Sequence, residues 1–158
     1  MNIFIFFRDF RIQDNNGLNQ FMDETESVTP IFCFTPEQIN ENNNKYFSHN
    51  SVQFLCESLR DLRKNISQKG GELYIFHSEL LTLLRKIHKE SKIVSIGFNT
   101  DYTPYAKERE QAIKFMCKSL EITCKVYHDY LLAPIGSFLK GDGNPYTVYT
   151  PFKNFVYK

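Results

Sequence analysis

The sequence predicts an α/β fold, a Rossmann-like open sheet of five parallel strands in the order 3-2-1-4-5 with helices on both faces. Short apolar runs alternate with helical patterns along most of the chain, which is typical of strands joined by right-handed helical crossovers. Several runs are apolar almost throughout, as expected of strands covered on both faces. Ligands of such sheets bind beyond the carboxyl ends of the strands, where the winding direction reverses.

Five runs rich in Ile, Val, Phe and Tyr are the predicted strands. They occupy residues 2–7, 28–34, 72–77, 92–98 and 122–128. The loops after the first, second and fourth runs are therefore the places to look for a site.

Helical patterns fill the intervals between these runs. We expect a short helix near 16–23. Val52, Leu55, Leu59, Leu62 and Ile66 repeat at spacings of three and four, which predicts an amphipathic helix over 49–69 that ends at Lys-Gly-Gly. The Leu-rich stretch 79–90 predicts the next helix. A last one is predicted over 104–120, with Pro104 suited to its first turn.

The bulk composition is that of one folded domain rather than of a basic nucleic-acid-binding chain. The 158 residues carry a net charge of +1, so no overall field draws the chain to DNA or to an acidic membrane. The four cysteines lack zinc-type spacing, and we expect buried free thiols in a reducing compartment. The amino terminus has no leader pattern, and its apolar run is far too short to span a bilayer. We expect a soluble intracellular protein.

Motifs for a self-sufficient active site are missing from the sequence. The four histidines are scattered, and neither a phosphate-binding glycine loop nor a nucleophile elbow is present. Asp9, Asp14 and Asp101 fit no metal-binding spacing. We therefore predict no catalytic residue and no metal site in this chain.

A dense cluster of polar residues follows the first predicted strand. It comprises Arg8, Asp9, Arg11, Asp14 and Asn15. We expect Asp9 or Asp14 to pair with Arg8 or Arg11, which would fix the shape of the loop and support a docking surface.

The pattern changes from about residue 133, where turn signals replace the alternation of strands and helices. The last nine residues predict the start of a helix with Pro151 in its first turn. Phe152 and Phe155 would lie on one face of it, with nothing to cover them. We predict that Pro151, Phe152 and Phe155 contact a partner.

Several segments together resemble the DNA photolyase and cryptochrome family. The opening "IFFRDFRIQDNNGL" is similar to the family's first strand and loop, with Phe7 where the family usually has an Arg. "NTDYTPYAKERE" and "GNPYTVYTPFKNF" resemble two later family motifs, and "FCFTPEQI" and the segment 51–79 are also similar. Five motifs in the right order cover essentially the whole chain.

The resemblance implies a two-part protein. Residues 1–132 would be the photolyase-type α/β domain, and residues 133–158 the start of a linker to a helical FAD-binding domain that is absent from this chain. FAD and damaged DNA would be bound only by that helical part. By the resemblance, Arg8, Asp9 and Arg11 form a structural network close to it.

The resemblance also implies an antenna chromophore of the deazaflavin or folate type. Phe32 and Asp101 match positions that contact the deazaflavin in members that use it. Thr35 and Ser51 depart from that subgroup, where an acid and an arginine stand. Tyr105 and Ala106 replace the Asn-Glu pair of folate-binding members.

The function implied is that of the amino-terminal portion of a deoxyribodipyrimidine photolyase, a lyase for light-driven repair of pyrimidine dimers. This chain would be inactive alone and would act with a separate helical FAD-binding portion, as the product of a split gene or as a truncated chain. The alternatives are a cryptochrome-type light-sensing module without repair activity, and a remnant or free-standing nucleotide-binding domain.

Overall fold

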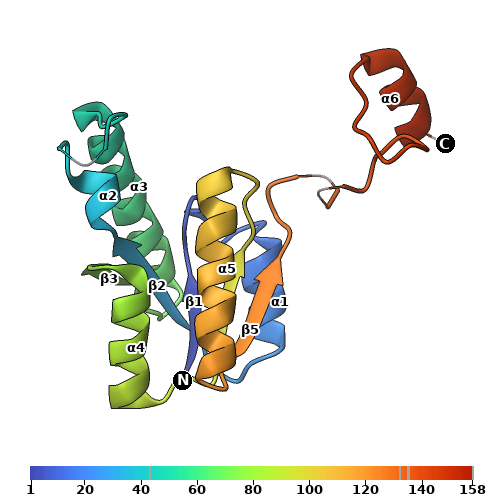
Figure 1. Ribbon diagram of the computed structural model, residues 1–158. Coiled ribbons are helices and arrows are strands. Elements are labelled where there is room, and N and C mark those ends of the chain that lie inside the picture. Colours follow the sequence, from blue (N-terminus) through green and yellow to red (C-terminus); the bar gives the residue numbers. More distant parts are fainter. Residues whose placement is uncertain (43, 132, 135, 158) are drawn as a thin grey trace.

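The computed structural model describes residues 1–42, 44–131, 133–134 and 136–157, and it confirms the predicted sheet (Figure 1). Five parallel strands are arranged in the order β3-β2-β1-β4-β5. Their bounds are β1 Asn2–Ile5, β2 Thr29–Phe34, β3 Tyr74–His77, β4 Ser95–Asn99 and β5 Thr123–Tyr127.

The helices follow the predicted alternation with one addition. Their bounds are α1 Asn16–Asp23, α2 Pro36–Ile39, α3 His49–Gln68, α4 Leu80–Ser91, α5 Pro104–Ser119 and α6 Tyr149–Val156. Only α2, a single turn within the loop after β2, was not expected from the sequence. It begins with Pro36 at its first position, where a proline costs no hydrogen bond. None of the helices in the described ranges is long and apolar enough to cross a membrane.

The two faces of the sheet bury separate cores because side chains alternate along each strand. Ile3 and Ile5 of β1 face α4 and α5, whereas Phe4 and Phe6 face α1 and α3. Figure 1 shows α4 and α5 in front of the sheet and α1 and α3 behind it. The predicted helices on both faces are therefore confirmed.

Gly97 of β4 provides the space in which Phe21 of α1 packs against the sheet. A Cβ atom at position 97 would lie 2.6 Å from Cδ2 of Phe21, closer than carbon atoms can approach. The aromatic side chain of Phe21 is fully buried there. A glycine at this place in the strand is thus a packing requirement of the α1 face.

A buried polar cluster fastens the first loop to the sheet. We call Asp9, Asn15 and Asn99 the Asp9 cluster; all three are at most 2% exposed. Asn99 Nδ2 donates to Asp9 Oδ2 at 2.6 Å, and Asn15 Nδ2 donates to the same oxygen at 3.2 Å. The amides of Phe7 and Arg8 donate to Asp9 Oδ1 at 3.1 and 3.2 Å. The carboxylate therefore joins β1, α1 and β4 at one point.

Asn15 has a second role as the cap of α1. Its Oδ1 accepts a hydrogen bond from the Leu18 amide at 3.0 Å and another from Asn99 Nδ2 at 2.9 Å. Such a cap satisfies one of the free amides at the start of the helix. The same side chain thus fixes where α1 begins and links it to β4.

The carboxyl-terminal segment, residues 136–157, lies away from the sheet in Figure 1. The expectation that nothing covers Phe152 and Phe155 holds only in part, because both rings contact other aromatic rings of the segment while Phe155 stays 44% exposed. Phe138 stacks edge-on against both, with centroids 6.0 and 6.3 Å away, and Tyr146 packs on Phe155 at 5.6 Å. The segment folds back at an isolated bridge between Leu139 and Pro145 and builds a small aromatic cluster of its own.

The expectation of four buried thiols is also wrong in part. Cys33 and Cys117 are buried and Cys124 is half-buried, but Cys56 is exposed. The reason is the helical period, because the residues of α3 that face the core are Leu59, Leu62 and Ile66. Cys56 lies on another face of that helix.

The packing at Gly97 predicts the effect of one added methyl group. Gly97→Ala should lower the free energy of unfolding by about 1–3 kcal/mol, because Phe21 must move out of its place in a dense core. Urea unfolding followed by circular dichroism measures this. Gly141→Ala is the matched control, since a Cβ there meets no atom within 4 Å. Equal stability of the two variants would contradict the packing role.

The Asp9 cluster predicts a larger loss. Asp9→Ala should lower the free energy of unfolding on the order of 3 kcal/mol, because two buried amide side chains and two backbone amides lose their acceptor. Thermal and urea unfolding measure the change, with the exposed Asp23→Ala as control. A variant as stable as the wild type would show that the carboxylate does not hold the first loop.

Candidate functional site

The carboxyl edge of the sheet gathers the loops that follow β1, β2 and β4. Strand β1 lies between β2 and β4, so the winding direction of the chain reverses beside it, which is where open α/β sheets bind their ligands. This edge is at the top of Figure 1. The Asp9 cluster is its buried floor, and the charged side chains of the first loop stand above it.

Arg8 reaches across the edge to the loop after β4. Its Nη1 lies 3.0 Å from Oδ2 of Asp101, whose side chain is buried while that of Arg8 is half exposed. Asp101 Oδ1 accepts from the Tyr102 amide at 2.6 Å, just before α5 begins. Burial alone would raise the pKa of Asp101, but the hydrogen bonds from Arg8 and from the two following amides outweigh it and lower the pKa.

Arg11 makes the second link, to the end of β5. Its Nη2 lies 2.7 Å from Oδ2 of the fully buried Asp129 side chain, whose Oδ1 accepts from the Asn16 amide at 2.8 Å. The predicted pairing of Asp9 or Asp14 with Arg8 or Arg11 is therefore wrong. Both arginines pair instead with carboxylates more than ninety residues away in the sequence.

Asp9 and Asp14 have other structural roles, which explains the wrong pairing. The Asp9 carboxylate turns inward to the Asp9 cluster. Asp14 adopts a left-handed backbone with φ of 54°, a conformation that Asp and Asn tolerate better than most residues. Its carbonyl oxygen accepts a hydrogen bond from Arg11 at 2.8 Å. The first loop is thus a scaffold. Asp9 and Asp14 make their contacts close to the loop, whereas Arg8 and Arg11 pair with carboxylates of the loops after β4 and β5.

Arg109 of α5 is a half-buried cation at this edge. Its guanidinium carbon lies 3.5 Å from the ring centroid of Phe7 and 5.6 Å from that of Tyr105. Burial lowers the pKa of Arg109. Among the described residues, no carboxylate lies within 4 Å of its nitrogens. A desolvated guanidinium stacked on aromatic rings can still bind an anionic or polar group of a ligand.

Two further hydroxyl groups are withdrawn from water at this edge. Tyr130 Oη lies 3.5 Å from Asp9 Oδ1, and burial followed by the charge of Asp9 raises the pKa of Tyr130. Thr35, directly after β2, is 7% exposed and caps α2 with its side chain turned toward the Gln38 amide, at a geometry in which its Oγ1 makes no hydrogen bond within the described part of the structure. A buried hydroxyl without a partner is unusual and is a group that a ligand can satisfy.

An open hollow of about 530 Å³ lies beyond the carboxyl ends of β2 and β3. Its volume is in the range of ligand pockets, roughly 300–1,000 Å³. Pro36, the residue after Thr35, lines it together with Ile39, Phe47, His49 and His77. A second hollow, of about 420 Å³, runs along the face of the sheet between α1 and α3. The first fits the usual place of a ligand in this type of sheet.

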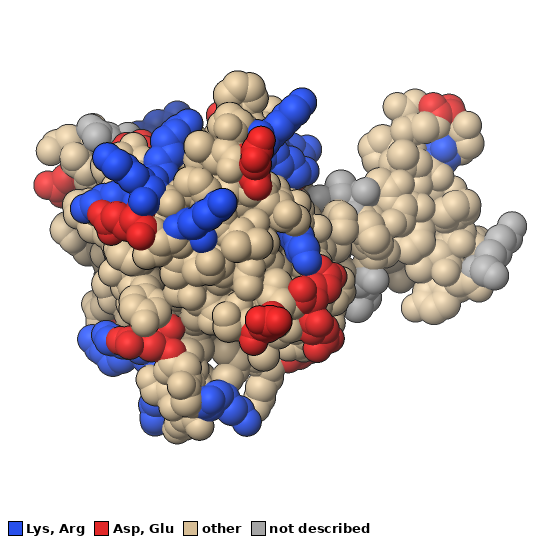
Figure 2. Space-filling view, turned by 90° about the horizontal axis from the view of Figure 1, so that it is seen from below, with Lys and Arg blue, Asp and Glu red and all other residues tan. Residues whose placement is uncertain are grey.

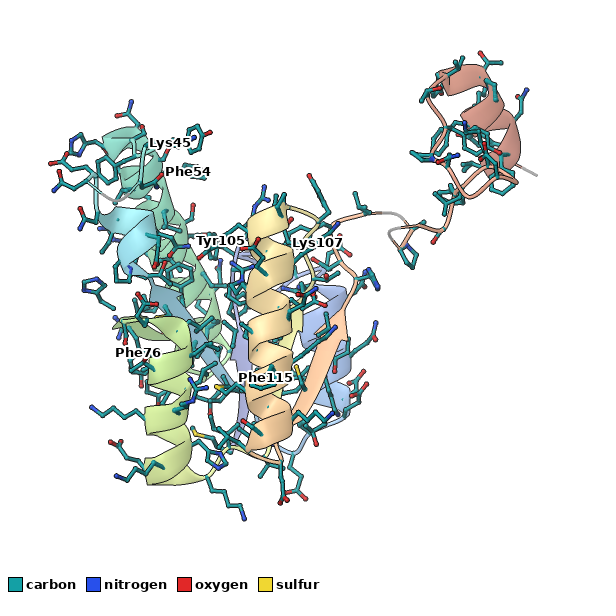
Figure 3. All side chains as sticks on the ribbon, viewed as in Figure 1. Lys45, Phe54, Phe76, Tyr105, Lys107 and Phe115 are labelled. Carbon is teal, nitrogen blue, oxygen red and sulfur yellow. The ribbon has the colours of Figure 1, made fainter. Side chains whose placement is uncertain are left out.

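Exposed aromatic side chains border the edge. Phe54 is 72% exposed, and Tyr102 and Tyr105 are about half exposed. Figure 3 shows Phe54 near the start of α3 and Tyr105 near the start of α5, both at the carboxyl end of the sheet. Such rings are suited to contact with a ligand or a neighbouring domain.

The two predicted chromophore contacts are placed differently. Asp101 lies at the edge, paired with Arg8. Phe32 is 1% exposed and packs edge-on against Phe10 and Phe34 in the core below α3. The structure therefore does not bring Phe32 and Asp101 onto one open surface, and their role in chromophore binding stays a prediction.

Four residues with contacts to the first loop were not predicted from the sequence: Asn99, Arg109, Asp129 and Tyr130. Asn99 and Asp129 each directly follow a predicted strand, which is a signal that could have found them. Arg109 sits on a helix, where a charged residue is ordinarily solvated.

Comparisons with known proteins agree with this architecture. The family model described as DNA photolyase matches residues 2–158. The crystal structure of an archaeal photolyase from Sulfolobus tokodaii with two FAD molecules superposes with a TM-score of 0.85 at 35% identity. The superposition covers 97% of this chain and 33% of that chain.

Curated relatives include both photolyases and cryptochromes. Cryptochrome-1 of Aedes aegypti is 31% identical over 80% of this chain and 24% of its own length. The deoxyribodipyrimidine photo-lyase of a Synechococcus species is 26% identical over 92% of this chain and 29% of its own length. An uncharacterized 31.6 kDa protein of another Synechococcus strain is 29% identical over 96% of this chain and 52% of its own length.

This chain thus spans between about a quarter and about half the length of these curated relatives. The match of the family model extends over nearly every residue, and the strand order is the one predicted from the sequence. The chain belongs to the DNA photolyase family, as its amino-terminal α/β domain.

Proposed function

We propose that this chain is the amino-terminal α/β portion of a deoxyribodipyrimidine photolyase and acts together with a helical FAD-binding portion. The observation that carries the proposal is the likeness to the Sulfolobus photolyase, at 35% identity over 97% of this chain. In this proposal, light-driven repair takes place at the FAD of the helical portion. The α/β portion supplies a site for an antenna chromophore and a surface for the helical portion.

The carboxyl edge supports the antenna part of the proposal. Thr35 Oγ1 is a buried hydroxyl without a partner, and the hollow beside it has the volume of a ligand site. The antenna, when bound, absorbs near-ultraviolet or blue light and passes the excitation energy to FAD. We expect Thr35 to hydrogen-bond its polar ring edge and Arg109 to interact with an anionic substituent.

We favour a flavin-type ring over a pterin as the antenna. The Sulfolobus photolyase structure holds two FAD molecules and was interpreted as having a novel light-harvesting cofactor. Tyr105 and Ala106 depart from the folate-type pair. We therefore propose a flavin or deazaflavin antenna, with Asp101 positioning the Arg8 side chain at its rim.

The carboxyl-terminal segment, residues 136–157, supports the partner part of the proposal. Its described residues include only three charged side chains, Lys140, Asp142 and Lys153. Figure 2 shows this segment at the right with few charges, whereas positive and negative side chains are mixed over the rest of that side. Tyr149 and Tyr157 are 71% and 82% exposed. A weakly charged surface with exposed aromatic rings is suited to burial against another domain.

A cryptochrome-type light sensor is the second candidate, because Cryptochrome-1 of Aedes aegypti is similar over 80% of this chain. The two candidates differ in the chemistry at FAD, which the proposal assigns to the helical portion. They are distinguished by one assay.

That assay measures repair by the complete protein, with this chain and its FAD-bearing helical portion purified together. An oligonucleotide with one cyclobutane thymine dimer is incubated in blue light and in the dark. We expect light-dependent loss of the dimer. A protein that binds FAD and shows a light-induced flavin spectrum without repair would contradict the photolyase proposal and favour the light sensor.

The ion pair between Arg8 and Asp101 at the proposed antenna site predicts the effect of removing the charge of Asp101. Asp101→Asn should weaken antenna binding roughly tenfold, since Arg8 loses its partner at the edge while the shape of the side chain is kept. The ratio of antenna absorbance to protein measures this after purification. Glu108→Gln, an exposed carboxylate of the nearby α5, is the control. Equal antenna content in both variants would rule out a role of Asp101 at the site.

The aromatic segment predicts where the helical portion is bound. Tyr149→Asp should weaken association with that portion roughly tenfold or more, because a charge enters an apolar contact. Phe152→Asp should abolish it, since it also breaks the packing against Phe138.

Co-purification and sedimentation measure the association, while circular dichroism checks that the sheet stays folded. Phe115→Asp is the matched control, an exposed aromatic of α5 outside the segment. If both segment variants associate as well as this control does, the helical portion binds elsewhere.

A further inference from the structure

The two edge strands of the sheet differ in how they are protected against pairing with another strand. Strand β5, at one edge, carries Lys125, whose Nζ lies 2.6 Å from Oε2 of Glu24 at the end of α1. Strand β3, at the other edge, contains no lysine, arginine or acidic residue. Charged residues on edge strands are a common device against such pairing. Strand β3 therefore lacks a protection that β5 has.

The side chains of β3 are accessible on both faces of the sheet. Phe76 is half-buried against the core below α4, and Tyr74 faces the same side but is 45% exposed. Ile75 and His77 face the opposite side, and both are exposed. Figure 1 shows β3 at the outer edge of the sheet, and Figure 3 labels Phe76 there. Neither face of this strand is therefore fully covered by a helix.

The backbone of β3 has hydrogen-bonding groups that point away from the sheet. The Ser78 amide donates to the Phe34 carbonyl at the end of β2 at 3.0 Å. Because alternate residues of a strand face the same neighbour, Phe76 also bonds to β2. The amides and carbonyls of Ile75 and His77 then point toward the open edge. An extended strand is the partner that matches the spacing of these groups.

We propose that β3 pairs in the antiparallel direction with β3 of a second copy of this chain. The two-fold axis passes between the Phe76 residues of the two copies. In this register Ile75 of each copy exchanges both of its backbone hydrogen bonds with His77 of the other copy. Two five-stranded sheets thereby become one continuous sheet.

The residues of β3 fit pairing of the strand with itself. At the axis the two Phe76 residues form a non-hydrogen-bonded pair, in which side chains on neighbouring strands approach most closely. Aromatic pairs at such positions stabilise a sheet. Tyr74 lies opposite Ser78 of the other copy. No Lys, Arg, Asp or Glu lies within residues 74–78, so like charges do not oppose one another in the paired segment.

The pairing is short, so the dimer is weak. Beyond residues 74–78, Glu72 of one copy would lie beside Glu79 of the other, which limits the pairing to this segment. Five residues from each copy bury less than the roughly 1,000 Å² typical of a stable interface, and we expect a dissociation constant on the order of 100 µM. The inference does not depend on the proposed function, because it rests on the open edge alone.

Sedimentation velocity of the full chain tests the dimer over about a hundredfold range of concentration around the expected dissociation constant. We expect a shift from monomer toward dimer as the concentration rises. Ile75→Lys should weaken the association roughly tenfold or more, because it places a charge on the pairing edge. Thr123→Lys is the matched control, since it adds the same charge to an exposed position of β5. Circular dichroism checks that both variants are folded.

A cross-link tests the register in a Cys56→Ser background, which removes the exposed native cysteine. Phe76→Cys should join two copies through a disulfide on mild oxidation. The Cα atoms of such a pair lie about 4.5 Å apart, within the roughly 4.4–6.8 Å that a disulfide spans. Tyr74→Cys should give no cross-link, because the two positions 74 are about 13 Å apart along the strands. Non-reducing electrophoresis and peptide mapping identify the joined positions.

The proposal is overturned if the wild-type chain stays monomeric over the whole range of concentration. Association of Ile75→Lys as strong as that of Thr123→Lys would place the contact elsewhere on the molecule. A disulfide through position 74 in place of position 76 would equally contradict the proposed pairing.

Discussion

The structure depends on one buried carboxylate, that of Asp9. Asn15, Asn99 and two backbone amides donate to it, and without water each of these donors needs that acceptor. Through them the first strand, the first helix and the fourth strand are joined at the place where the winding direction reverses. The loop that carries Arg8 and Arg11 can therefore hold a definite shape although Arg8, Gln13 and Asp14 are exposed to water.

The family motif of this loop has a physical explanation residue by residue. Asp9 is the acceptor of the cluster, and Asn15 both caps α1 and completes the cluster. Asp14 provides the left-handed turn. The two arginines extend from this scaffold to Asp101 and Asp129, so they fasten the loops after β4 and β5 to the first loop. The Asp9 cluster and the two arginine pairs together keep the carboxyl edge of the sheet ordered, as binding of a ligand or a second domain requires.

The sequence was sufficient to place the strands and the long helices, because their apolar periods mark them. It was insufficient for the partners of charged residues. Arg8 pairs with a residue 93 positions away, and no local pattern carries that information. The turn α2 was missed because a single turn has no period. Three other features depend on the tertiary arrangement. They are the burial of Phe32, the exposure of Cys56 and the packing of aromatic rings in the last segment.

The most direct test of the account is an absorption spectrum of the purified chain. The chain has nine Tyr and no Trp, so its own side chains absorb only in the ultraviolet region of tyrosine and phenylalanine. The account predicts an additional near-ultraviolet or blue band, bound in a fixed ratio to the protein and lost on unfolding. A folded chain that lacks this band when expressed in cells that supply the chromophore would contradict the assignment of an antenna site to the carboxyl edge.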